Sequence, residues 1–229
     1  AMLEALTHEV EAIGQDRSIR VVVITANGRA FCAGHDLKEM RARPEQAYYE
    51  ELFKRCSKFM LSLLALPQPV IARVHGVATA AGCQLVATCD LAVAAEEARF
   101  GTSGINVGLF CMTPGVGISR NMGRKDAFEM LFTGDLATAQ DALNLGLINK
   151  VVPASELDRA VEHYTDKIKG KSAAAVSAGK KLYYQQLEMG ITDAYALAGQ
   201  EMARNMMFHD AAEGIDAFIE KRKPVWRHE

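Results

Sequence analysis

The order of apolar and polar residues divides the chain into two parts, of which the first alternates strands with helices. Uninterrupted runs of β-branched and small apolar residues are typical of strands that are buried on both faces. Such a run predicts a strand at Arg20–Thr25, and two further strands are predicted at Val70–Val74 and Leu91–Ala94. Apolar residues at helical spacing predict helices between them, at Met2–Ile13, at Pro44–Leu66 and from Gly76 to Cys89.

The second part of the chain, beyond Phe100, is predicted to be almost entirely helical. It opens with a glycine-rich stretch, Gly101–Gly117, which predicts a loop or short strand built for close backbone approach. A short strand at Ile148–Val152 interrupts helices at Lys125–Phe132, Thr138–Leu143, Ala154–Lys169, Ser172–Met189, Asp193–Met207 and Asp210–Arg222. The sequence therefore predicts an α/β protein with a β/α core at residues 1–130 and a helical region at residues 131–229.

Charge balance and cysteine usage exclude several classes of protein. With 26 Lys and Arg against 28 Asp and Glu, the formal net charge is -2, which argues against binding to nucleic acid. The most apolar long window, Gly76–Ala95, holds Gln84 and Asp90 among small residues, so we expect a buried core segment and no membrane span. The five cysteines include no C-x-x-C pair and predict reduced thiols rather than disulfides or a zinc site.

Searches for common catalytic motifs leave only two glycine-containing loops. The chain has no phosphate-binding G-x-x-x-x-G-K-[ST] motif, no G-x-S-x-G nucleophile elbow and no H-x-x-x-H pair. Gly115-Val-Gly117 begins like a dinucleotide-binding fingerprint but lacks its third glycine. We therefore expect no metal and no permanently bound cofactor.

Each of the two loops follows a predicted buried strand and leads towards a helix. The first is Ala33-Gly34-His35-Asp36, and the second runs from Gly76 to Gly82. Backbone N–H groups at such junctions are free to point at a ligand oxygen, and two that converge on one carbonyl form an oxyanion hole. The alternative is that these glycines only permit tight packing of helix against sheet, and spacing does not choose between the two.

The residues of these loops resemble the enoyl-CoA hydratase/isomerase (crotonase) superfamily. The first signature is Ala30-Phe-Cys-Ala-Gly-His-Asp-Leu-Lys-Glu39, and the second is Pro69-Val-Ile-Ala-Arg-Val-His-Gly-Val-Ala-Thr-Ala-Ala-Gly-Cys-Gln-Leu85 with Cys89-Asp90. The similarity continues in order through Ala98-Arg-Phe-Gly101, Leu131-Phe-Thr-Gly-Asp135, Ala142–Leu147 and Phe218-Ile-Glu-Lys-Arg-Lys223. It thus extends over nearly the whole chain.

This resemblance implies a crotonase (ClpP-like) spiral of ββα units, a helical C-terminal region that makes trimers, and acyl-CoA thioesters as ligands. The chain is then a homotrimer or a dimer of trimers, with coenzyme A present as part of the substrate. By the same resemblance, the backbone N–H groups of His35 and Ala81 are the oxyanion donors. The coenzyme A contacts are then Phe31, Cys32, Ala33, Asp36, Leu37 and Lys38. Lys221 contacts a coenzyme A phosphate in this reading, and the alternative is that Lys221 is only a solvated cation at a helix end.

Two positions depart from the family's acid–base chemistry. The two glutamates of the hydratases align with Gln84 and Gly104, and neither an amide nor a glycine transfers protons near pH 7. Loss of such a group typically costs about 10²–10⁴-fold in rate, so efficient hydration of enoyl-CoA is doubtful. Candidate replacements are His35, Cys111 and Cys83. The dihydroxynaphthoyl-CoA synthases also have Gly at the second position, but keep an aspartate where this chain has Cys111.

Two functions stay open at this point. The first is an enzyme of fatty-acid and acyl-CoA metabolism that uses the oxyanion hole with other acid–base residues. The second is a non-catalytic member that binds acyl-CoA or regulates a partner. We expect a cytoplasmic protein. The family's first β-hairpin has no counterpart in this sequence, so the mitochondrial matrix is the alternative if a presequence is missing as well.

Overall fold

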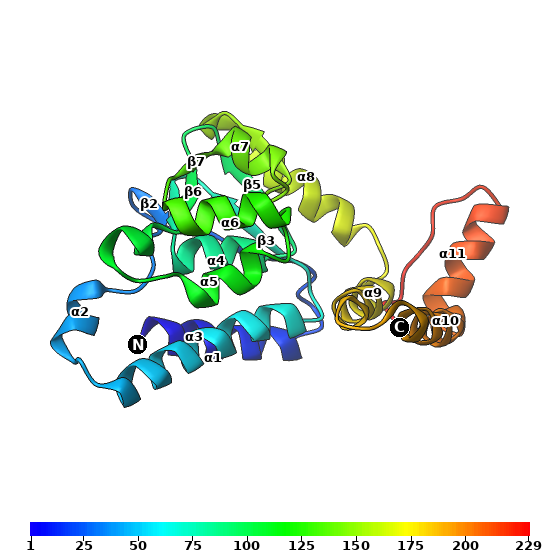
Figure 1. Ribbon diagram of the computed structural model, residues 1–229. Helices are drawn as coiled ribbons and strands as arrows, with labels where there is room; N and C mark the ends of the chain where they lie inside the picture. Colours follow the sequence, from blue (N-terminus) through cyan, green and yellow to red (C-terminus); the bar gives the residue numbers. More distant parts are fainter.

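The chain, described over residues 1–229 by a computed structural model, is built on two four-stranded sheets (Figure 1). Sheet A has the strand order β1-β3-β5-β8 and sheet B the order β2-β4-β6-β7. The strands are β1 (Val22–Ile24), β2 (Ala30–Cys32), β3 (Val70–Val74), β4 (Val77–Thr79), β5 (Leu91–Ala95), β6 (Arg99–Gly101), β7 (Ala137–Thr138) and β8 (Lys150–Val152). Every pair is parallel except β6 with β7.

The chain winds as a spiral, because consecutive strands alternate between the two sheets. β1, β3 and β5 each enter sheet A, and β2, β4 and β6 follow them into sheet B. A helix then returns the chain to the start of the next turn, as parallel neighbours require. The predicted α/β spiral of ββα units is confirmed.

Helices surround the two sheets. They are α1 (Met2–Gln15), α2 (Leu37–Ala42), α3 (Gln46–Ala65), α4 (Ala81–Thr88), α5 (Met112–Ile118), α6 (Arg124–Thr133), α7 (Ala139–Asn144), α8 (Leu157–Lys169), α9 (Ala173–Leu187), α10 (Ile191–Met206) and α11 (His209–Ile219). Two short 3₁₀ helices are η1 (Ser103–Val107) and η2 (Ala154–Glu156). None of these helices combines the length and the apolar character that a membrane span needs.

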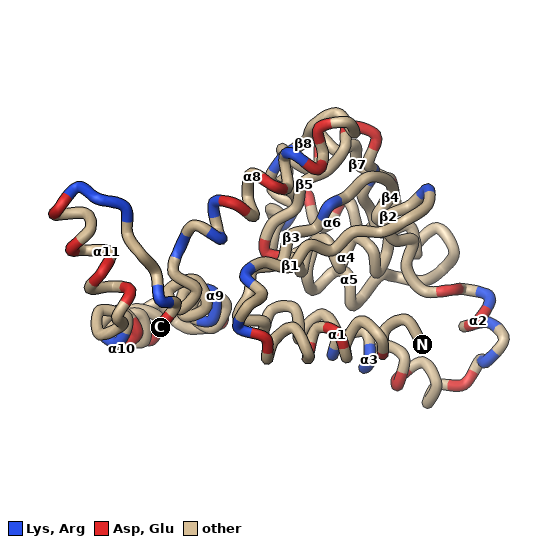
Figure 2. The backbone as a smooth tube through the Cα atoms, turned by 180° about the vertical axis from the view of Figure 1, so that it is seen from behind, with Lys and Arg blue, Asp and Glu red and all other residues tan.

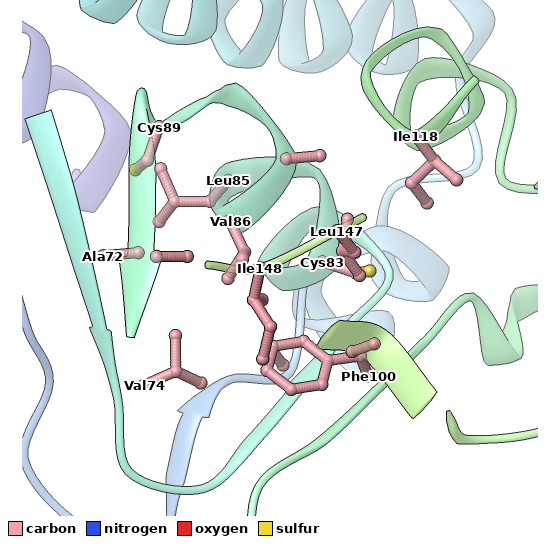
Figure 3. Packing of buried hydrophobic residues seen from close by; sticks show 14 of the residues in the cluster. Ala72, Val74, Cys83, Leu85, Val86, Cys89, Phe100, Ile118, Leu147 and Ile148 are labelled. Carbon is pink, nitrogen blue, oxygen red and sulfur yellow. The ribbon is translucent and has the colours of Figure 1, made fainter. Parts of the chain in front are cut away.

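The hydrophobic core lies around α4 and the faces of the two sheets (Figure 3). α4 packs against α3, α5, β2 and β4, and all of its residues from Gly82 to Thr88 are buried. The small side chains of this helix explain its position, because they let these four elements approach it closely. The helix that carries one of the two predicted loops is therefore held rigidly from several sides.

The structure corrects the prediction for several short elements. The stretch Gly101–Gly117 is neither a loop nor a strand over most of its length, because it contains η1 and most of α5. Some elements contain too few residues to show a periodic pattern of apolar side chains in the sequence. These are the three-residue strands β2, β4 and β6 and the short helix α2. Sheet B was therefore missed, whereas the β-branched strands of sheet A match their predicted positions closely.

The last three helices, α9–α11, form a C-terminal arm that stands apart from the sheets (Figure 1). One polar cluster anchors the arm to the core. The Lys180 Nζ lies 2.7 Å from Asp90 Oδ2, and it also donates to the backbone oxygens of Leu63 and Gln68. The Tyr184 hydroxyl donates to the other oxygen of Asp90 at 2.6 Å. By contrast, β8 pairs with β5 in sheet A, so the core includes residues beyond 130.

Candidate functional site

Three segments meet at one edge of sheet B. β2, β4 and β6 are parallel neighbours, with Cys32 opposite Ala78 and Thr79 opposite Gly101. Because the carboxyl ends of parallel strands lie at the same edge, the residues after each strand come together there. These are residues 33–36, 80–84 and 102–104.

Two glycines allow the first two segments to touch. A Cβ atom on Gly82 would lie 2.0 Å from the Cys32 carbonyl oxygen, so only glycine fits where α4 meets β2. Gly34 has a φ of 92°, and a Cβ on it would lie 3.4 Å from the backbone nitrogen of Ala81. The loop before His35 is therefore in direct contact with the first turn of α4.

Ala80 holds an unusual conformation between β4 and α4. Its φ of 52° and ψ of -119° match the first central position of a type II′ turn, where glycine is the ordinary residue. Its backbone N–H donates to the Gly101 oxygen at 3.0 Å. Among the backbone hydrogen bonds outside the regular elements, none has the N–H of His35 or Ala81 as donor.

His35 and Asp36 occupy separate environments. The His35 ring meets the Phe53 ring edge-on, with 5.6 Å between centroids, and burial lowers its pKa below the ordinary 6.5. The ring is therefore neutral at pH 7. Asp36 caps α2 by accepting from the backbone N–H groups of Lys38 and Glu39.

Comparison with known proteins adds to this geometry. The sequence model described as enoyl-CoA hydratase/isomerase matches residues 1–229. The chain belongs to the enoyl-CoA hydratase/isomerase family. Human enoyl-CoA hydratase domain-containing protein 3, mitochondrial, is 47% identical over 229 residues, which cover 100% of this chain and 76% of that protein. The 2,3-dehydroadipyl-CoA hydratase of Escherichia coli is 35% identical, over 99% of this chain and 88% of its own.

Solved structures of the family show the same fold. An enoyl-CoA hydratase of Mycobacterium smegmatis is 60% identical with a TM-score of 0.97, over 99% of this chain and 88% of its own. The human domain-containing protein 3 has a TM-score of 0.95 at 47% identity, over 98% and 89% of the two chains. The ββα spiral and the C-terminal arm are thus features of the family fold.

Gln84, which is predicted from the sequence to stand at the first family glutamate position, has an unsatisfied side-chain oxygen. It is 5% exposed, its Oε1 is enclosed, and no hydrogen bond within the chain reaches its amide. A buried polar group left unpaired costs about 1–3 kcal/mol. Gln84 lies one turn beyond Ala81 on α4, and helical side chains lean towards the N-terminus.

Gly104, at the second such position, has no room for a side chain. A Cβ atom on it would lie 2.5 Å from the Leu109 oxygen and 2.8 Å from the Cys111 Sγ. The Gly104 oxygen accepts from the Leu109 N–H at 2.9 Å, which fixes this close approach. A glutamate at 104 requires a different path for the residues up to Cys111.

Around these two positions the chain carries no charge. Residues 76–89 and 100–119 contain no Asp, Glu, Lys, Arg or His, and α4 and α5 are free of charged residues in Figure 2. Cys83 is fully enclosed, and burial raises its pKa to about 12, so it is a neutral thiol at physiological pH. Cys111, the N-cap residue of α5, lies beside Gly104 and is also buried. His35 is the one titratable group of the meeting loops that is neutral and half-buried.

The residues predicted to contact coenzyme A differ in exposure. Phe31 belongs to the hydrophobic core, so its side chain is closed to a ligand. Ala33, Asp36, Leu37 and Lys38 are exposed on the loop and on α2. α11, which Lys221 follows in the C-terminal arm, lies far from α2 and α4 in both views of the chain (Figures 1 and 2). One copy of the chain does not bring Lys221 to the other residues.

Two surface cavities lie away from this site. One, of about 430 Å³, is lined by residues of α6 and α7 and by Asp135, whose backbone packs against Gly101. The other, of about 440 Å³, lies between the end of α3 and α9.

Sequence reasoning missed Thr79 and Ser103. Their hydroxyl oxygens are 3.0 Å apart, and each residue directly precedes a site position, Ala80 or Gly104. The second signature contains Thr79 without giving it a role, and the pairing with Ser103 cannot be read from the sequence because it depends on β4 and β6 being neighbours.

Proposed function

We propose that this protein binds acyl-CoA thioesters and polarises the thioester carbonyl with the backbone N–H groups of His35 and Ala81. The contact between Gly34 and the Ala81 nitrogen carries this proposal, because it brings the two donor segments to one point. Family membership supports the same ligand class. The substrate then belongs to fatty-acid or acyl-CoA metabolism.

The carbonyl oxygen gains negative charge as an enolate forms at the adjacent carbon. Preorganised N–H donors stabilise such charge better than water does, because they need no reorganisation. Ala81 is also the first residue of α4, where the helix dipole favours negative charge. Coenzyme A is held as part of the substrate, by the exposed loop and α2, and by Lys221 of a neighbouring copy.

Ordinary hydration of enoyl-CoA is slow in this proposal. The reaction needs a proton acceptor for water and a proton donor for carbon, and Gln84 is neither. Its free amide instead orients a water or the substrate carbonyl. The second candidate function, binding without turnover, is favoured by the absence of charged residues at 76–89 and 100–119.

Assembly and compartment follow from the same proposal. The C-terminal arm exposes large apolar side chains that a homotrimer, or a dimer of trimers, would cover. Five free cysteines fit a reducing cytoplasm or mitochondrial matrix. Relatives such as the human protein carry the word mitochondrial in their names, which favours the matrix where the source cell has one.

The test compares binding with turnover on the same ligands. Calorimetry should show butyryl-CoA binding more tightly than free coenzyme A, while crotonyl-CoA loses its conjugated absorbance at least about 100-fold more slowly than with an ordinary hydratase. Equal binding of butyryl-CoA and coenzyme A would contradict the carbonyl site. Fast hydration would contradict the role given to Gln84.

A single substitution sharpens this test. Gln84→Glu restores one carboxylate at a position that already holds a side chain of that size, whereas Gly104→Glu has no space. We expect Gln84→Glu to raise hydration measurably and the exposed control Gln140→Glu to leave it unchanged.

A further inference from the structure

We infer that Thr79 and Ser103 form a positioning pair that holds the Ala81 N–H in place for a thioester carbonyl. This inference rests on the proposed function, because it concerns the same carbonyl site. The Thr79 Oγ1 and Ser103 Oγ are hydrogen-bonded at 3.0 Å, and either hydroxyl has the geometry to donate. Thr79 lies within the second signature but has no role assigned by the resemblance, and Ser103 lies outside the quoted motifs.

The pair acts on a strained turn. Ala80 has a φ of 52°, and a residue with a Cβ in such a conformation costs about 1–3 kcal/mol unless its surroundings hold it. Two bonds hold it here, one from the Ala80 N–H to the Gly101 oxygen and one between the side chains of Thr79 and Ser103. Both join the turn to the same short segment, residues 101–103.

Residues 101–103 are in turn held by α6 and by the residues that follow it. Thr102 is fully buried, and its hydroxyl donates to the Met130 oxygen of α6 at 2.9 Å. A Cβ on Gly101 would lie 2.7 Å from the Asp135 oxygen, so the chain after α6 closes directly over Gly101. α6 therefore stabilises the Ala80 turn indirectly, through the contacts of Thr102 and Ser103 and the bond from Ser103 to Thr79.

The orientation of the Ala81 N–H depends on this support. The peptide that carries this N–H joins Ala80 to Ala81, so relaxation of the Ala80 φ and ψ angles rotates it. A donor that turns away from the developing oxyanion loses most of its effect, because hydrogen bonds weaken steeply with angle. Loss of either hydroxyl should therefore weaken recognition of the carbonyl and leave the rest of the ligand in place.

The test separates the carbonyl from the rest of the ligand. Binding of butyryl-CoA, a thioester, is compared with binding of S-butyl-CoA, a thioether that lacks the carbonyl. Two hydrogen bonds of about 1 kcal/mol each correspond to roughly 30-fold tighter binding of the thioester. Ser103→Ala and Thr79→Val should reduce this ratio below about 5, with the Kd for S-butyl-CoA unchanged.

Controls keep a positioning role apart from a structural one. Thr79→Ser retains a hydroxyl and should restore the ratio, and Ser119→Ala, on the exposed end of α5, should leave it unchanged. A second readout is the absorbance of a bound cinnamoyl-type thioester, which shifts to longer wavelength when its carbonyl is polarised. Ser103→Ala should remove that shift. Ser103→Ala deletes one oxygen, so it decides the question if Thr79→Val does not fold.

The outcomes are distinct. If the wild-type protein shows no preference for the thioester, the proposed function fails and this inference fails with it. If the wild-type preference and spectral shift persist in Ser103→Ala, the positioning pair is overturned while the carbonyl site stands. If the variants weaken both ligands equally, the hydroxyl pair supports the fold and not the carbonyl, which also overturns it.

Discussion

Phe100 and Phe218 show how differently two regions of the molecule use the same side chain. Phe100 on β6 has no exposed surface and lies in the main core cluster (Figure 3). Phe218 on α11 is 86% exposed. The arm repeats this pattern on all three of its helices, at Tyr183, Leu187, Ile191, Tyr195, Met202, Met206, Met207 and Ile219.

The two regions are held together by different forces. Burial of apolar surface stabilises the sheets and α4. The arm buries few apolar side chains, and its attachment depends on Lys180, Asp90 and Tyr184. One copy of the chain thus completes its core but leaves the arm half covered, which is the arrangement expected if other copies cover the remainder.

The matched phenylalanines give the largest expected contrast. Phe100→Ala should lower the free energy of unfolding by about 4 kcal/mol, because it removes a fully buried aromatic ring and leaves a cavity. Phe218→Ala should change the stability of the isolated chain by less than about 0.5 kcal/mol. Urea unfolding at low protein concentration measures both. A loss of several kcal/mol for Phe218→Ala that vanishes on dilution would show that another copy buries this ring.

The anchor of the arm should be sensitive to its buried charge. Lys180→Met leaves Asp90 with the Tyr184 hydroxyl and one backbone N–H but without its counter-ion, and we expect a loss of about 3 kcal/mol. Lys181→Met, its exposed neighbour, is the control and should be nearly silent. Burial already lowers the Lys180 pKa, and Asp90 opposes this effect. Equal stability of the two variants would mean that packing alone attaches the arm.

A pair of glycines contrasts the two regions on a smaller scale. Gly104→Ala places a Cβ against the Leu109 oxygen and the Cys111 Sγ, so we expect a loss of about 2 kcal/mol. Gly179→Ala, within α9, has open space around its Cβ and should gain about 0.5–1 kcal/mol from helix propensity. Thermal unfolding of both variants checks the signs. A neutral Gly104→Ala would show that the η1–α5 connection adapts and that a side chain fits there.

The sequence predicts sheet A well and sheet B poorly, for a physical reason. Val70–Val74 is apolar at four of its five positions, with Arg73 as the exception, and such a composition is typical of a strand buried on both faces. The strands of sheet B have three residues or fewer, and Ala30–Cys32 or Arg99–Gly101 contain no periodic pattern. They form because the winding of the chain places them beside one another.

The candidate site divides in the same way. His35, Ala81, Gln84 and Gly104 follow from motifs that are local in sequence. The closure of Gly104 by Cys111 and the bond between Thr79 and Ser103 join residues that no local pattern relates. These features follow from the fold, and neither of them involves a charged side chain.

The end of the arm gives the smallest effect and a pH dependence. Glu213 accepts two hydrogen bonds from Arg222 and one from the Val225 N–H, and these lower its pKa from 4.5 to about 2. Since the folded pKa lies below the unfolded one, this contribution is complete above pH 4.5 and is lost as the pH falls towards 2.

Trp226, the single tryptophan, reports on this tail. Its indole N–H donates to the Gly170 oxygen, and its ring lies against Gly214. Between pH 4.5 and 2 its fluorescence should therefore change in the wild type as the tail detaches. In Glu213→Gln the fluorescence change between pH 4.5 and 2 should be smaller, because residue 213 no longer titrates. In the control Glu201→Gln the change should be as large as in the wild type. The same acid transition in both variants would assign the attachment of the tail to the bonds from Asp210 to the N–H groups of Arg227 and His228 instead.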